Sequence, residues 1–75
     1  MLFLIEYDRS KGEIVTFQKF GNHEWEAAEG SRLDMELDLH RHSVEHEVVL
    51  LEAENEEALR RTHRRYFEDL EQLVS

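Results

Sequence analysis

The sequence predicts a small α+β protein with the element order strand, strand, helix, strand, helix. Its 75 residues are enough for one compact domain, residues 1–75. Two runs of β-branched and aromatic residues near the N-terminus flank a turn that ends in glycine, and a third such run separates two segments with helical spacing of apolar residues. The simplest architecture is a small three-stranded mixed sheet with two helices packed on it.

The N-terminal part of the chain is predicted to form a β-hairpin. Leu2 to Tyr7 and Glu13 to Phe20 are rich in residues that suit a pleated, half-buried surface. The polar connection between them ends at Gly12, and glycine adopts a positive φ at little cost. We therefore expect Gly12 to have a positive φ or to flank a residue that does.

A helix is predicted from about Asn22 to Arg41. Asn22 can cap its start, and apolar residues recur at helical spacing along it. A strand over residues 33–40 is the alternative, because apolar and polar residues alternate strictly there and Gly30 could end the helix just before. The composition favours the helix, since leucine, methionine and glutamate are good helix formers and no residue in that stretch is β-branched.

The second half of the chain is predicted to contain a loop, a strand and a helix. His42 to His46 forms the loop, and Glu47 to Ala53, a short apolar run with adjacent valines, forms the third strand. Asn55 can cap a final amphipathic helix from about Glu56 to Leu73. If all strands share one sheet, the helix before the third strand sets strands two and three parallel through a right-handed crossover.

Strands one and three are apolar on both faces. In strand one, Leu2 and Leu4 alternate with Phe3, Ile5 and Tyr7. Two helices on one side of the sheet would leave the other face open, whereas a sheet with one wet face shows polar alternation. Either one helix covers each face, or a homodimer buries the open face. The second possibility predicts a dimer with aromatic anchors at its interface, for which the candidates are Trp25, Phe17 and Tyr66.

The charge of the chain restricts its partners. It has 18 acidic and 9 basic residues and a net charge of −9, which disfavours binding to nucleic acid phosphates. The apolar start of the chain is too short for a signal peptide or a membrane span, and there is no cysteine. We expect a soluble, cytoplasmic protein that does not bind membranes, does not bind nucleic acid in general and needs no cofactor.

A dense basic patch occurs in the last predicted helix. It consists of Arg60, Arg61, Arg64 and Arg65. Each arginine has an acidic residue four positions away, an arrangement that braces an exposed helix. The pairs are Glu56–Arg60, Glu57–Arg61, Arg64–Glu68 and Arg65–Asp69. A self-paired solvent face is the favoured interpretation, and contact with an acidic protein partner or a second copy is the alternative. Binding to RNA, which Tyr66 and Phe67 beside the arginines would favour, is the least favoured interpretation.

Histidines suggest two further sites. His40, His42 and His46 lie near glutamates, in the predicted loop and just before it. The sequence has neither a helical His-Glu-x-x-His pair nor a thiolate, so we predict no metal site. His63 lies beside the apolar stripe of the last helix, near Tyr66. A catalytic role for His63 would need a partner such as Glu6 or Tyr7 across the sheet.

The sequence contains no phosphate loop, nucleophile elbow or cysteine-based site. We therefore predict a non-enzymatic, self-associating protein-interaction module. The alternative is a small-ligand-binding protein or an enzyme with a pocket near His63 and Tyr66. A concave pocket that holds His63 together with a second titratable group would favour this alternative.

Overall fold

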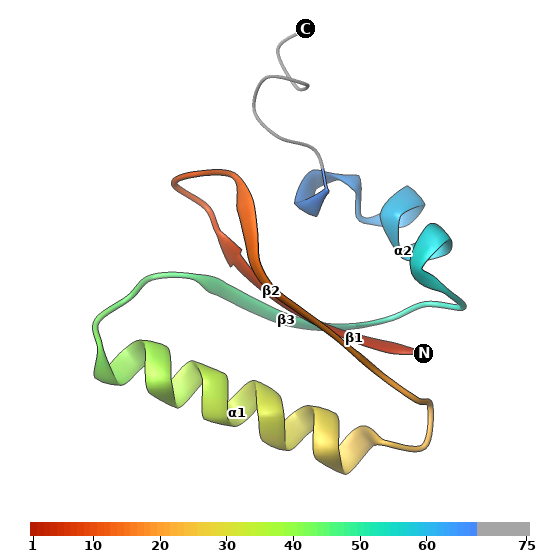
Figure 1. Ribbon diagram of the computed structural model, residues 1–75, viewed down its shortest axis with the longest axis horizontal. Coiled ribbons are helices and arrows are strands. Elements are labelled where there is room, and N and C mark those ends of the chain that lie inside the picture. Colours follow the sequence, from red (N-terminus) through yellow and green to blue (C-terminus); the bar gives the residue numbers. More distant parts are fainter. Residues whose placement is uncertain (68–75) are drawn as a thin grey trace, which may run out of the picture.

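The computed structural model describes residues 1–67 and confirms the predicted α+β fold and element order (Figure 1). The elements are β1 (Leu2–Asp8), β2 (Glu13–Phe20), α1 (Trp25–Arg41), β3 (Glu47–Glu52), α2 (Glu56–Thr62) and the short 3-10 helix η1 (Arg64–Tyr66). The end of the last predicted helix, residues 68–73, lies outside the described residues. Within residues 1–67, no helix is both long enough and apolar enough to cross a membrane.

The sheet has the strand order β2-β1-β3, and both pairs are antiparallel. β2 and β3 run in the same direction, as a helical crossover requires, but β1 lies between them and no parallel pair forms. The sheet is therefore antiparallel throughout instead of mixed. β1 is the central strand, and β2 and β3 are the two edges.

The hairpin between β1 and β2 has the predicted turn. Gly12 has a φ of 68°, which confirms the prediction, and its N–H donates to the carbonyl of Asp8 at 2.8 Å. Further along, the register shifts: Glu6 lies opposite Thr16 and Tyr7 lies opposite Ile14. Val15 is the extra residue of a bulge in β2.

α1 is continuous through residues 33–40, so the alternative strand there is wrong. α2 begins at the predicted Asn55 cap, whose side-chain oxygen accepts from the N–H of Ala58 at 2.8 Å. It ends at Thr62 and does not continue without a break toward Leu73 as predicted, because His63 has the non-helical angles φ −122° and ψ 51°. The chain then forms η1.

The two helices lie on opposite faces of the sheet (Figure 1). Phe3 and Ile5 point toward α2 and η1, where they form the core with Leu59 and Tyr66. Leu2, Leu4 and the α1 residue Ala28 are also fully buried, and the two leucines alternate with Phe3 and Ile5 along β1. Each sheet face is thus covered within one chain. The open face that was one reason to expect a dimer does not exist, and a self-association surface has to lie elsewhere.

Candidate functional site

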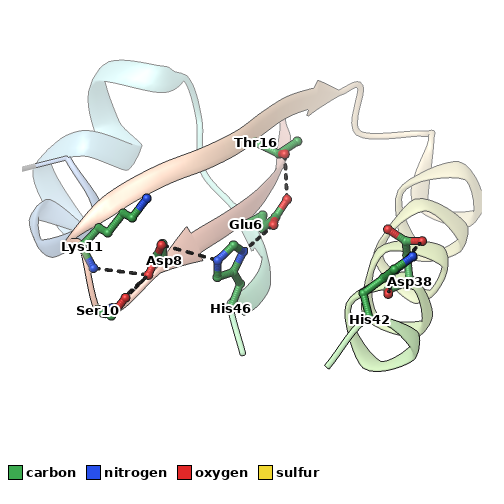
Figure 2. Close-up of polar contacts among 8 residues, drawn as sticks. All are labelled: Glu6, Asp8, Ser10, Lys11, Thr16, Asp38, His42 and His46. Carbon is green, nitrogen blue, oxygen red and sulfur yellow. Dashed lines mark hydrogen bonds and ion pairs between the residues drawn. The ribbon is translucent and has the colours of Figure 1, made fainter. Parts of the chain in front are cut away.

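A cluster of polar side chains lies where β3 begins, and we name it the His46 cluster. Nδ1 of His46 lies 2.6 Å from a carboxylate oxygen of Glu6, and Nε2 lies 3.5 Å from a carboxylate oxygen of Asp8 (Figure 2). Glu6 and Asp8 are two residues apart on β1, so both side chains point to the α1 face, and each residue is only 8% exposed. The imidazole therefore bridges two nearly buried carboxylates.

Neighbouring residues complete the hydrogen bonds of the His46 cluster. The Thr16 hydroxyl donates to Glu6 at 2.8 Å, and the Ser10 hydroxyl donates to Asp8 at 2.7 Å (Figure 2). The Ser10 side chain lowers the pKa of Asp8; burial opposes this in part, while the N–H groups of Lys11 and Ser10 and the nearby His46 add to it. Within residues 1–67, no buried side-chain nitrogen or oxygen lacks a hydrogen-bond partner. The cluster thus stabilises the start of β3, and its groups are already engaged within the chain.

His46 lines two surface hollows. The larger, about 500 Å³, is lined by Arg9, Ser10, Glu45, His46 and Glu47. The smaller, about 270 Å³, combines apolar side chains with two imidazoles; its lining residues are Glu36, Leu39, His40, Val44, His46 and Val48. We name this second one the imidazole hollow. It lies between the C-terminal half of α1 and the start of β3.

The histidines considered as metal ligands point to different parts of the molecule. His46 contacts β1, whereas Nδ1 of His42 lies 2.8 Å from the carbonyl oxygen of Asp38 in the last turn of α1 (Figure 2). In the part of the chain that the structure describes, no three histidine or acidic side chains are arranged to hold a metal ion.

The predicted pocket residue His63 lies beside Tyr66, with ring centroids 6.5 Å apart. Tyr66 is 6% exposed, packs edge-on against Tyr7 at 5.1 Å, and accepts a hydrogen bond from Arg65 at 2.7 Å. Tyr7 therefore lies on the same sheet face as Tyr66, where a catalytic role for His63 would need a partner. Glu6 does not, because it points to the opposite face, where it contacts His46.

Two of the predicted helix-bracing pairs are confirmed. Arg60 donates to Glu56 at 3.3 Å, and Arg61 donates to Glu57 at 3.4 Å. Lys19 of β2 also contacts Glu56 at 3.0 Å. Its hydrogen bond lowers the pKa of the Glu56 carboxyl group, and Arg60 adds a smaller effect in the same direction. The charged side chains of α2 named here are thus paired with residues of the same chain.

Arg65 binds a different acidic residue within the described part of the chain. Its guanidinium donates to the Glu47 carboxylate of β3 at 2.8 Å and lies over the Tyr66 ring. The predicted partners of Arg64 and Arg65, residues 68 and 69, lie outside the described residues.

The three candidate interface anchors lie in different environments. Trp25 is 47% exposed at the start of α1. Phe17 packs against Phe3 and Phe67 with ring centroids 5.8 and 5.9 Å apart, and Tyr66 belongs to the same core. Trp25 is thus the one of the three with a large exposed side chain.

The outer edge of β3 carries backbone groups that point away from the sheet. Met1 and Ala53 exchange two backbone hydrogen bonds, of 2.9 and 3.0 Å, which fixes the phase of the β1–β3 ladder. In an antiparallel pair, hydrogen-bonded and non-hydrogen-bonded positions alternate. Val48, Leu50 and Glu52 therefore direct their N–H and C=O groups outward, and no strand within residues 1–67 pairs with them. We name these three residues the β3 edge.

The two edges of the sheet differ in their protection. β2 has the bulge at Val15 and a charged Lys19, both features that discourage pairing with another strand. β3 has an uninterrupted register, and four consecutive apolar residues, 48–51, lie between its terminal glutamates. All four are partly accessible. β3 thus has the features of a strand that can accept another strand.

No protein-family model, curated protein or solved structure matches this chain. The function has to be inferred from the site itself. The sequence contained a signal for part of the His46 cluster: Glu6 and Asp8 occupy one face of a strand that we treated as apolar on both faces. It contained no signal that His46, forty positions from Glu6, would bind there.

Proposed function

We propose that the protein is a non-enzymatic interaction module that associates with copies of itself. The observation that carries this proposal is the β3 edge, where outward N–H and C=O groups accompany an uninterrupted register and four consecutive apolar residues between two glutamates. Such an edge is a ready template for another strand. The small size of the chain supports the same conclusion, because small domains without disulfides gain burial by oligomerising.

The other candidate functions and partners are less well supported than self-association. The titratable groups of the His46 cluster already bind one another, and Tyr66 beside His63 is buried and hydrogen-bonded. An acidic protein partner is less favoured than a second copy, because Arg60, Arg61 and Arg65 each bind a glutamate of their own chain. A cytoplasmic location remains part of the proposal and agrees with the absence of cysteine.

Sedimentation equilibrium at micromolar concentrations tests self-association. We expect a mass that rises with concentration toward that of a dimer. Added salt should strengthen the association, since it screens the repulsion between two chains that each carry a net charge of −9. A monomer mass across the whole concentration range, at low and at high salt, would contradict the proposal.

A further inference from the structure

We infer that two copies pair through β3 in antiparallel orientation about a two-fold axis, which makes one continuous six-stranded sheet. This inference rests on the proposed self-association and specifies its interface. In the resulting order, β2-β1-β3 of one copy continues into the β3, β1 and β2 of the other. A two-fold axis perpendicular to the sheet keeps both α1 helices on one face and both α2 helices on the other face.

The phase of the β3 edge restricts how two copies of β3 can pair. Two residues directly opposite each other in an antiparallel pair either both direct their backbone N–H and C=O groups toward the other strand or both direct them away from it. The backbone N–H and C=O groups of Glu52 are directed outward, and those of Glu47 are directed toward β1. A register that places Glu47 opposite the partner's Glu52 is therefore excluded. That excluded register is also the one that would bring like charges together. The centre of the strand then offers two registers, with the axis at Val49 or at Leu50.

Both registers bring apolar residues together. With the axis at Val49, Val48 lies opposite the partner's Leu50. With the axis at Leu50, Val49 lies opposite the partner's Leu51. Cross-strand pairs of this kind stabilise antiparallel sheets, and neither register places two carboxylates directly opposite each other. The Glu47 carboxylate at the start of β3 is neutralised within its own chain, because Arg65 binds it at 2.8 Å.

The position of Glu52 relative to the imidazole hollow favours a second copy as the occupant of this edge. Glu52 lies opposite Leu2 in the register, so its side chain is on the α1 face, as this hollow is. The axis at Val49 places the partner's Glu52 opposite His46, and the axis at Leu50 places it opposite Val48. His46 and Val48 both line the hollow, together with His40. His46 already lies between Glu6 and Asp8, and Glu36 of the same hollow binds Arg32. The His40 side chain has no hydrogen bond or ion pair within residues 1–67, so self-pairing brings a carboxylate to a hollow whose second imidazole can donate to it.

Single-cysteine variants locate the axis, because the chain has no cysteine of its own. Residues on the axis have Cα atoms about 4.5–5.5 Å from their copies, within the range for a disulfide. Val49→Cys or Leu50→Cys should therefore cross-link to a dimer under mild oxidation. Glu52→Cys is the matched control: with the axis at Leu50 its copy lies four residues along the strand, about 13 Å away, and still farther with the axis at Val49. It should not cross-link.

A proline at the β3 edge tests the hydrogen bonds themselves. Glu52→Pro removes an outward N–H and spares the β1 ladder, whereas Glu52→Ala removes the same carboxylate and keeps the N–H. Each dimer loses two hydrogen bonds in the proline variant, so we expect its dissociation constant to exceed that of the alanine variant by about tenfold or more. Circular dichroism checks that the proline variant is folded, and the cysteine variants test the pairing independently.

The possible outcomes separate the interface from self-association. A dimer that cross-links at position 49 or 50 but not at 52 supports β3 pairing. A dimer mass without these cross-links, or with equal dissociation constants for folded proline and alanine variants, overturns the pairing and leaves the proposed function standing. A wild-type protein that remains monomeric overturns both.

Discussion

The Glu6 carboxylate and the His46 imidazole lie 2.6 Å apart although forty positions separate them in the sequence. Their side chains are only 11% and 18% exposed, and the contact joins the central strand to the residue just before β3. It therefore fixes where β3 begins on β1. Because β3 forms the edge proposed for self-association, this contact also supports the interface.

Replacing His46 with alanine should destabilise the fold. The variant removes a charge-assisted hydrogen bond and leaves the Glu6 carboxylate nearly buried, with the Thr16 hydroxyl as its remaining side-chain partner. We expect the free energy of unfolding to fall by about 1.5–3 kcal/mol, measured by urea denaturation.

His42→Ala is the matched control for this prediction. His42 also faces a carboxylate, that of Asp38 at 3.4 Å, but both side chains are about two-thirds exposed. Exposed ion pairs contribute little, so this variant should change stability by less than about 0.5 kcal/mol. Equal losses in the two histidine variants would show that the burial of the Glu6–His46 pair has no energetic role.

Local sequence patterns were sufficient to predict the hairpin, the existence of α1 and the start of α2, although α1 has Glu24 and not the predicted Asn22 at its N-cap position. Glycine was placed at the turn position that has a positive φ, and Asn55 was placed at a helix cap, because these preferences depend on a few adjacent residues. The composition of residues 33–40 likewise decided correctly between helix and strand.

Relationships between distant segments could not be predicted in the same way. Nothing local in Val48 or Leu50 indicates that β3 pairs with β1 and not with β2, because strand pairing depends on the whole chain. The His46 cluster depends on that pairing and was missed with it. The helix break at His63 was missed because the apolar spacing continues through it, while Arg65 turns toward Glu47 on β3.

Asp8 should make stability dependent on pH in the acid range. Its pKa is lowered in the folded protein, first by the Ser10 hydroxyl, so the unfolded chain binds the proton more readily. The stability that ionised Asp8 contributes is present above the ordinary carboxyl pKa of about 4 and is lost as the pH falls through the folded value. Urea denaturation at several pH values should show that wild type exceeds Asp8→Asn at neutral pH and that this difference narrows in acid.

Ser10→Ala tests the cause of this pH dependence. Removing the hydroxyl that donates to Asp8 at 2.7 Å should bring the folded pKa closer to its ordinary value. The stability of the Ser10→Ala variant should then change less between neutral and acid pH than that of wild type. An unchanged acid limb would assign the lowered pKa to the backbone N–H groups or to His46 instead.

Two glycine substitutions should have opposite effects. Gly12→Val places a β-branched residue at a φ of 68° and should cost about 1–3 kcal/mol. Gly30 lies inside α1 with open space around the position of a Cβ atom, so Gly30→Ala should stabilise the protein by about 0.5–1 kcal/mol. Thermal melting compares the two variants, and an unchanged melting temperature for Gly12→Val would contradict the turn geometry.

The arginines of the C-terminal basic patch should differ in their importance for stability. Arg61 and Glu57 form a pair whose side chains are 71% and 84% exposed, so Arg61→Ala should change the free energy of unfolding by less than about 0.5–1 kcal/mol. Arg65 instead connects η1 to β3 through Glu47 and lies over the buried Tyr66 ring, so Arg65→Ala removes packing as well as charge. Urea denaturation should therefore rank Arg65→Ala as clearly less stable than Arg61→Ala.

RNA binding tests the interpretation of the basic patch as a self-paired surface. We expect no RNA affinity that depends on Arg61. An affinity for RNA that fell steeply with added salt and with Arg61→Ala would show that the patch is a phosphate-binding surface.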